Sequence, residues 1–377
     1  MVMTSPKDSE PAEFARRSKP WKLKVLLLAV PVVLILVIHL YFSVWVLHYV
    51  NQKINENGVY SGSIENVDLH LWRGAYVIRN ITIYKNSGKV PVPFFSAPAI
   101  DFSFEWKALI NGAYVGNIEC EKPKLNFVNG PTEAESQAGG DTPWIAIIKK
   151  LFPLHINRFH VDNGEVHYRD FYSHPQVDIA LTEVYLTASN LNNSKKLAKS
   201  AVATIHAEGK PVKEGMLKID VTLDPYPVEP TFTLKGEMTP IPMSDLNQLA
   251  RAYGNFDFQS GTFAAAMQIK AEKGRFQGYF KPVFDHMEIA NSAHNSGNPV
   301  RFFWDALLDT TGHLLRNLRK DRFATLIPIS GSIHHPQTAV MAAIGNVFKN
   351  AFVRPYSATV PGNIDTSDTH TKESPTH

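Results

Sequence analysis

The sequence predicts a mainly β protein that follows a single N-terminal transmembrane helix. Two observations carry this prediction. Residues 25–50 contain no Lys, Arg, Asp or Glu, and such a run exceeds the about 20 apolar residues that a helix needs to cross the hydrocarbon core of a bilayer. Behind it, apolar and polar residues alternate with a period of two in many short runs, which is typical of strands with one apolar face.

The flanks of the apolar run predict its orientation. Within the 20 residues after it the only basic residue is Lys53, whereas five precede it: Arg16, Arg17, Lys19, Lys22 and Lys24. The positive-inside rule therefore predicts residues 1–24 as a cytoplasmic tail and the bulk of the chain on the other side of the membrane. A cleaved signal peptide is the alternative. Its apolar core runs only about 7–15 residues and ends in a small-x-small site, which Leu47-His48-Tyr49 does not provide.

Alternating runs recur from residue 59 to residue 298. Ile100–Trp106 and Leu217–Leu223 are clear examples, in which every second residue is apolar. Asn163-Gly164 stands between two short apolar runs, and this dipeptide favours the turn of a tight β-hairpin. We therefore expect roughly a dozen strands, with a hairpin at Asn163-Gly164.

A linker divides the expected β region. Residues 129–142 are rich in Gly, Glu and Ser and contain no large apolar residue, so we expect them to join a smaller β part, 59–128, to a larger one, 143–298. Short helices are expected within the larger part at 143–151 and at 244–253, the second with Ser244 as its N-cap.

The C-terminal part of the sequence predicts helices rather than strands. Residues 299–356 predict a helical cap, which consists of helices near 299–323 and 338–352 with a short strand between them at 326–333. Residues 357–377 predict a disordered tail. We expect the cap to cover an edge of the sheet with a basic helix end that contains Arg316, Arg319, Lys320 and Arg322.

Composition and motifs argue against several functions. The net charge of +3, without a sustained basic run outside the helix flank, argues against nucleic-acid binding. Cys120 is the only cysteine, so we expect no intrachain disulfide and interpret Cys120 as a half-buried strand residue. No nucleophile elbow, Walker loop, HExxH motif or dinucleotide-binding turn is present, so no catalytic residue and no cofactor is predicted.

The histidines do not predict a metal site. Four of them lie between residues 155 and 174, but only His155 and His160 approach the spacing of a zinc site. We interpret His155, His160, His167 and His174 as surface residues of strands. His334 and His335 are adjacent and would face opposite sides of a strand.

The alternating apolar residues allow two architectures. Their shared face can be covered by a second sheet in a β-sandwich, or it can line an open trough, about 60 Å long for some 13 strands at about 4.8 Å each. Periodicity alone does not decide between them. The candidates for lining a trough are Val67, Leu69, Leu71, Ile100, Phe102, Phe104, Trp106, Val177, Ile179, Leu181, Leu217, Ile219, Val221, Phe263 and Ile269.

Several segments resemble AsmA-like bacterial envelope proteins, in particular their large uncharacterised-domain branch. The likeness extends over nearly all of residues 21–355. It is carried by residues 58–69, 73–76, 90–98, 161–171, 175–190, 243–247, 252–253, 261–263, 327–331 and 348–352.

This resemblance implies a single-pass protein of the bacterial inner membrane with a periplasmic body. It implies a long, curved, largely antiparallel sheet that forms a half-open groove, similar to that of chorein-type bridge proteins, with a few short helices near the C-terminus. The implied ligand is the acyl chain of a membrane phospholipid, and the implied role is lipid passage toward the outer membrane and envelope integrity. Envelope-assembly proteins or a homo-oligomer are the implied partners, since the chain is short for this group. A non-catalytic β-sandwich scaffold and a membrane-bound hydrolase are the competing hypotheses.

Overall fold

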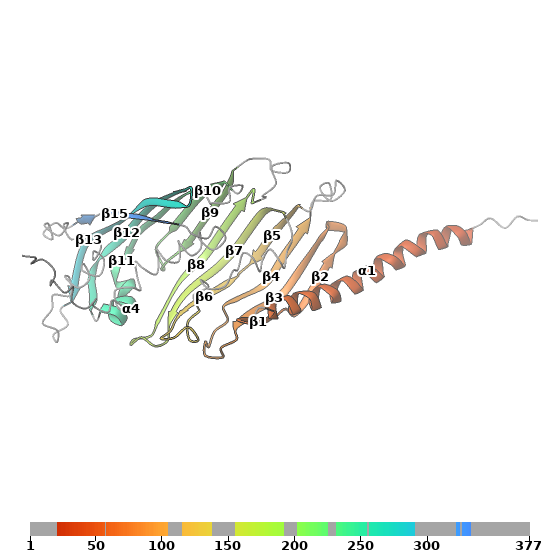
Figure 1. The fold of residues 1–377 in the computed structure, drawn as a ribbon, viewed down its shortest axis with the longest axis horizontal. Coiled ribbons are helices and arrows are strands. Elements are labelled where there is room, and N and C mark those ends of the chain that lie inside the picture. The colour runs from red at the N-terminus through yellow and green to blue at the C-terminus, as the bar shows by residue number, and fades with distance from the viewer. Residues whose placement is uncertain are drawn as a thin grey trace, which may run out of the picture.

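A computed structural model describes residues 21–56, 58–104, 115–137, 155–191, 202–224, 231–254, 256–290, 322–324 and 326–332. A long helix, α1 (Trp21–Asn55), leads into one sheet of fifteen strands (Figure 1). The prediction of a mainly β fold is therefore confirmed. The strands are β1 (Tyr60–Ser63), β2 (Asn66–His70), β3 (Ala75–Lys85), β4 (Phe95–Phe104), β5 (Val115–Glu121), β6 (Lys124–Asn129), β7 (His155–Asp170), β8 (Val177–Ser189), β9 (Ala203–Lys210), β10 (Leu217–Asp224), β11 (Thr231–Pro242), β12 (Asp257–Glu272), β13 (Arg275–Ala290), β14 (Arg322–Ala324) and β15 (Ile327–Ser332).

The sheet is mixed. Most neighbouring strands pair antiparallel, but β5 and β6 both run parallel to β7. β5 pairs with the first half of β7 and β6 with its second half. The expected linker therefore lies in the connection from β6 to β7, and the sheet continues across it. All the described strands belong to this one sheet, rather than to two packed sheets.

Strand pairing brings apolar residues to one side of the sheet, which we call the inner face. Directly paired residues of neighbouring strands point to the same side. One row of partners can be followed from β4 to β13: Ile100, Cys120, Val161, Leu186, Ala207, Ile219, Gly236, Met267 and Phe280. The next residue along each strand belongs to the opposite side, the outer face, which carries Asp101, Glu119, His160, His206 and Asp220.

The predicted hairpin at Asn163-Gly164 is wrong. Both residues lie inside the continuous strand β7, where the pairing with β8 shifts register at this point. Asn163 has a φ of 52°, the left-handed conformation that such a turn also uses. Here the left-handed residue forms a bulge instead of a reversal. β5 pairs with β7 before this point and β6 pairs with β7 after it, so the chain of β7 continues in one direction.

The bulge belongs to a row of left-handed residues that crosses the sheet, which we call the kink row. Asn80, Lys122, Asn163 and Glu183 have φ values of 52°, 44°, 52° and 48°. Asn80, Lys122 and Asn163 directly follow Arg79, Glu121 and Asp162. These three residues lie in one row of cross-strand partners, in which Arg79 pairs with Ala99, Ala99 with Glu121, and Glu121 with Asp162. The irregularities are therefore in register from β3 to β8.

Side-chain alternation inverts at the kink row. Inner-face residues on its two sides are separated by an odd number of positions, as for Ile78 and Ile81 in β3 or Val161 and Val166 in β7. In a regular strand such residues would point to opposite faces. Because β3, β4, β7 and β8 invert at the same level, the inner face of these strands stays apolar along their whole length.

The conformation of Asn163 gives a first prediction. Asn163→Val is expected to lower the free energy of unfolding by about 1–2 kcal/mol, because a β-branched residue is strongly disfavoured at positive φ. Asn163→Gly removes the same amide but tolerates this conformation, so it should leave stability nearly unchanged. Urea denaturation followed by circular dichroism measures both, and equal losses would contradict the role given to the backbone.

The last turns of α1 pack on the inner face at its N-terminal end. Val46, Val50 and Ile54 are buried and recur every four residues, so they form one stripe of the helix. Polar side chains fix the register. Asn51 Oδ1 accepts a hydrogen bond of 2.8 Å from the backbone N–H of Ile64, and Asn55 Nδ2 donates to the carbonyl of Gly62 at 3.0 Å. Helix and sheet are therefore joined by a specific contact.

The first half of α1 does not contact the sheet in this way. It projects from the end of the sheet (Figure 1), and its described apolar side chains between residues 25 and 37 are each at least 45% exposed. The side chains of residues 21–24, 34, 35 and 38–40 are not among those described. Within the described residues, no helix is long and apolar enough to qualify as a membrane span.

A helical segment links β11 to β12. It consists of η2 (Met243–Leu246), α4 (Asn247–Leu249) and η3 (Ala250–Gly254). The expected helix is thus present, but its N-cap is Pro242, without a side-chain cap, and Ser244 is not the cap. The helix begins earlier because Met243 is fully buried among the aromatic residues beneath it.

The described residues test only part of the C-terminal predictions. The expected strand near 326–333 is confirmed as β15. The helix expected to end at Phe323 is wrong in its last residues, since Arg322 and Phe323 belong to β14 and pair with β13. The helices expected at 143–151 and 338–352 and the tail at 357–377 lie outside the described residues.

Candidate functional site

The inner face collects the residues that the sequence nominated for a trough. By pairing register, every described candidate lies on this face. It includes Val67 and Leu69 in β2, Ile100, Phe102 and Phe104 in β4, Val177, Ile179 and Leu181 in β8, Leu217, Ile219 and Val221 in β10, and Phe263 and Ile269 in β12. Trp106 and the side chain of Leu71 lie outside the described residues. The candidates differ in what covers them.

The N-terminal end of the inner face is a closed core under α1. Val67, Ile100 and Phe102 are buried in one cluster with the helix residues Val50 and Ile54. The ring of Phe102 stacks on Tyr76 with centroids 4.9 Å apart, and burial raises the pKa of the Tyr76 hydroxyl. Leu69 and Phe104 pack at the margin of this cluster. These residues hold the helix on the sheet.

The far end of the inner face is covered by the helical segment 243–254. Phe263 is buried with Met243, Phe258 and Phe284. The amide side chain of Asn247 fixes the segment, because it accepts from the backbone N–H of Phe258 at 2.8 Å and donates to the carbonyl of the same residue at 3.0 Å. This end of the inner face is therefore also a packed core.

The half-buried region between these two cores is the candidate site, and we call it the middle surface. Val221 and Ile269 lie at its buried base, whereas Ile179, Leu181, Leu217 and Ile219 are only half-buried. The pairing register adds apolar residues that the sequence analysis did not nominate. These are the half-buried Ile205, Met267 and Phe276. The half-buried Phe159 and Leu186 border the core under α1, and Phe280 borders the core at the far end.

A buried carboxylate closes one edge of the middle surface. Asp170, at the end of β7, is only 4% exposed. One of its oxygens accepts from the backbone N–H groups of Tyr172 and Ser173 at 2.9 Å each. The other accepts from Asn129 Nδ2 at 2.8 Å and from the Tyr253 hydroxyl at 2.9 Å. Asp170 thereby joins the helical segment 243–254 to β7.

The Tyr253 hydroxyl acts as a donor in this cluster. Burial raises its pKa, and the hydrogen bond with Tyr168 and the charge of Asp170 raise it further. The hydroxyl therefore stays protonated, and the pair of Tyr253 and Asp170 persists across the neutral pH range. Together with the hydrogen bond of 3.1 Å from Gln248 Nε2 to the carbonyl of Gln176, it holds the helical segment against β7 and β8.

Removal of this carboxylate gives a second prediction. Asp170→Ala is expected to lower the free energy of unfolding by about 2–4 kcal/mol, because it leaves four partly buried donors without this acceptor. Asp178→Ala removes a carboxylate that is 48% exposed on the outer face and should cost no more than about 1 kcal/mol. Thermal and urea denaturation of the two variants provide the comparison. Similar losses for both would contradict the structural role of Asp170.

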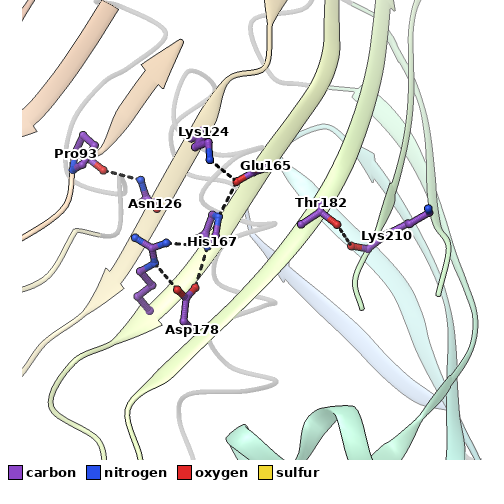
Figure 2. Close-up of polar contacts among 9 residues, drawn as sticks. Pro93, Lys124, Asn126, Glu165, His167, Asp178, Thr182 and Lys210 are labelled. Carbon is purple, nitrogen blue, oxygen red and sulfur yellow. Dashed lines mark hydrogen bonds and ion pairs between the residues drawn. The ribbon is translucent and has the colours of Figure 1, made fainter. Parts of the chain in front are cut away.

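The outer face of the same strands is charged. Figure 2 shows His167 between two carboxylates, 3.1 Å from Glu165 and 2.9 Å from Asp178. Lys124 pairs with Glu165 at 3.0 Å and Arg169 with Asp178 at 3.0 Å. The hydrogen bond between His167 and Glu165, together with Lys124, lowers the pKa of Glu165. Partial burial acts to raise the pKa of Asp178, but its hydrogen bonds with His167 and Arg169 lower it overall. A charged outer face leaves the inner face as the one suited to an apolar ligand.

The histidines take part in hydrogen bonds of the outer face. His160 Nδ1 lies 3.0 Å from the Thr187 hydroxyl, and His206 Nδ1 lies 2.7 Å from Asp220. In the ranges that the structure describes, no group of three or more His, Cys, Asp or Glu side chains is arranged to hold a metal ion. The His334-His335 pair lies outside those ranges.

The cysteine is part of the core. Cys120 lies in β5, is buried, and belongs to the cluster that contains Ile100, Val161 and the buried residues of α1. Burial raises the pKa of its thiol to about 12. The thiolate, which is the reactive form, is thus disfavoured at neutral pH.

This burial gives a third prediction. Cys120 in the native chain should fail to react with iodoacetamide at pH 8 and should react readily in urea, since unfolding restores an ordinary thiol pKa of about 8.5. Mass spectrometry of the intact chain measures the alkylated fraction. Rapid alkylation of the folded protein would show that the core beneath α1 is open.

Neither a scan against models of known protein families nor a search of curated proteins found a match for this chain. Its function is therefore argued from the inner face and from α1.

Proposed function

We propose that this chain is a membrane-anchored lipid-handling protein whose middle surface binds phospholipid acyl chains. The observation that carries the proposal is the asymmetry of the sheet. The inner face is apolar in register across the strands, whereas the outer face carries ion pairs. Between its two packed ends the inner face offers half-buried apolar side chains, which suit an acyl chain because each buried CH₂ contributes about 0.8 kcal/mol.

The proposal includes α1 as a signal anchor. Its described side chains from Val25 to Val37 expose apolar surface around the helix, and an exposed apolar surface of this extent requires a partner. The basic residues before the helix favour a cytoplasmic N-terminus. We infer a bacterial inner membrane and a periplasmic sheet from the resemblance to AsmA-like envelope proteins, along with a contribution to lipid passage toward the outer membrane.

The dimensions of the sheet favour an acyl ligand over a protein scaffold. Strands β7 to β12 lie side by side, and at about 4.8 Å per strand they span on the order of 25 Å. An extended acyl chain of a common phospholipid has a comparable length. An apolar face can also dock a protein partner, and the experiment below separates the two ligands.

Photocrosslinking in the membrane tests the proposal. A benzophenone amino acid is placed at Ile219 in one variant of the full chain and at Asp220 in another. The two positions are adjacent in β10 but lie on opposite faces. After illumination in native membranes, the Ile219 variant should form a covalent adduct with phospholipid, detected by mass spectrometry, whereas the Asp220 variant should not.

The alternatives give different results in the same experiment. Equal lipid adducts at both positions would indicate nonspecific contact with the bilayer. Absence of lipid at Ile219, with a protein adduct in its place, would favour the scaffold hypothesis instead.

A further inference from the structure

Trp72 is a strongly exposed tryptophan at the end of the sheet from which the exposed apolar half of α1 projects (Figure 1). It belongs to the short helical turn η1 (Leu71–Arg73) between β2 and β3, and its side chain is 89% exposed. A tryptophan in this state neither packs on the sheet nor covers α1. Its ring is amphipathic, and such rings concentrate at the boundary between the hydrocarbon core of a bilayer and water.

Contacts between α1 and β2 define the level of this turn along the helix. Asn51 bonds to the backbone of Ile64, while Phe42 contacts the ring of Tyr76 with centroids 6.4 Å apart. Tyr76 is the cross-strand partner of Leu69. From Ile64 through β2 to Leu69, the chain therefore follows α1 from Asn51 back to Phe42, toward the exposed apolar half of the helix.

The lengths of the two elements agree. The five residue steps from Ile64 to Leu69 cover about 16 Å in an extended chain, and the nine steps from Phe42 to Asn51 cover about 13 Å along the helix. Trp72 lies three residues beyond Leu69, which adds roughly 7 Å in this direction, or about one further helical turn. The turn η1 therefore reaches past the level of Phe42.

Tyr41 is the exposed aromatic residue of α1 nearest to this level, about one helical turn away, and Trp45 follows one turn further toward the sheet. Tyr41 is 77% exposed and Trp45 is 58% exposed, and Trp45 stacks on Tyr49 with centroids 5.3 Å apart. In Figure 1 the turn between β2 and β3 lies at the end of the sheet from which α1 projects. An exposed tryptophan of the sheet and the exposed Tyr41 of the helix thus lie within about one helical turn of each other along α1.

We propose that Trp72 is a second membrane contact, which inserts into the headgroup region of the bilayer near Tyr41. This inference rests on the membrane anchor of the proposed function. It adds that the sheet is held against the membrane at two points. The helix alone fixes a distance from the membrane, whereas helix and turn together fix the tilt of the sheet.

Fluorescent labels at single cysteines test this contact in the full chain. Trp72→Cys, Tyr41→Cys, Leu28→Cys and Tyr172→Cys are each labelled with the polarity-sensitive dye NBD. The chain without an added cysteine is the blank, since Cys120 is buried. Tyr172 is the matched control because it is an exposed aromatic residue at the opposite edge of the sheet, where β7 ends. The proteins are reconstituted in vesicles that contain phospholipids with a nitroxide quencher on the headgroup or on the acyl chain.

We expect the headgroup quencher to act on the Trp72 label as strongly as on the Tyr41 label and to leave the Tyr172 label unaffected. If the Trp72 label behaves like the Tyr172 label while the acyl quencher acts on Leu28, the second contact is wrong and the anchor stands. If the Leu28 label is not quenched, the anchor itself fails. If the Tyr172 label is quenched as well, the sheet lies flat on the bilayer, and a contact restricted to Trp72 is wrong.

Discussion

Val50→Asp is expected to lower the free energy of unfolding of the protein by about 3–5 kcal/mol, because it disrupts the contact between α1 and the sheet. Val50 is only 2% exposed and lies in the stripe of α1 that packs on the inner face. The substitution places a carboxylate among apolar side chains without a buried partner for its charge, and an uncompensated buried charge has a cost of this size. Urea denaturation followed by circular dichroism measures the loss.

Gln52→Asp is the matched control for this variant. It introduces the same carboxylate two residues further along the same helix, at an exposed position. Exposed substitutions usually change stability by no more than about 0.5 kcal/mol. Hydrogen exchange of β1 to β3 adds a local measurement, and Val50→Asp should accelerate it selectively. An equal effect of the two substitutions would mean that α1 does not dock on the sheet.

Ile219→Asp is expected to reduce acyl-chain binding by at least about ten-fold. The side chain lies half-buried in the middle surface, and a carboxylate in contact with hydrocarbon costs more than the 1.4 kcal/mol that corresponds to ten-fold in affinity. Binding is measured with a phospholipid that carries a photoactivatable acyl chain, by peptide mapping of the adducts on β7 to β12. Adducts on α1 serve as the internal reference for insertion in the membrane.

Thr222→Asp provides the control, because it adds the same charge to the same strand at an exposed position on the outer face. It should leave the adducts on β7 to β12 unchanged. Circular dichroism of Ile219→Asp decides whether this side chain lies on an open surface or in a closed core. A folded variant without lipid supports an open binding surface. A variant that unfolds would show that Ile219 belongs to a closed core, and the lipid proposal would be wrong.

Local patterns were sufficient to predict the strands. Alternation in Leu217–Leu223 identified β10 together with the face on which its apolar residues lie. The same reasoning identified β15 from residues 326–333. These predictions depend only on the two-residue repeat of an extended chain, which does not change with the partner that the strand finds.

Features that depend on distant segments were not predictable. The dipeptide Asn163-Gly164 has the conformational preference of a hairpin turn, but the parallel neighbours β5 and β6 turn this preference into a bulge. Ser244 has the chemistry of an N-cap, yet the burial of Met243 starts the helix earlier. Asp170 was not nominated for the same reason, because two of its four donors, on Asn129 and Tyr253, lie in segments far away in the sequence.

The candidate site was predictable as a face but not as a bounded surface. The sequence nominated Phe102 and Ile219 in the same way, because both belong to alternating runs. Packing separates them, since Phe102 is covered by α1 and Ile219 is half-buried. Which part of an amphipathic sheet is covered depends on where helices dock, and this information is absent from the periodicity of the strands.

The kink row has a consequence for how a sheet of this kind can change during evolution. A deletion of one residue from β7 between Val161 and Val166 would turn half of that strand over, so that polar side chains would meet hydrocarbon. The neighbouring strands would have to lose a residue at the same level to restore the match. Lengthening the protein by duplication of whole hairpins at its C-terminal edge requires no such coordination. Descendants of this architecture should therefore differ in how many strands they contain far more readily than in how long each strand is.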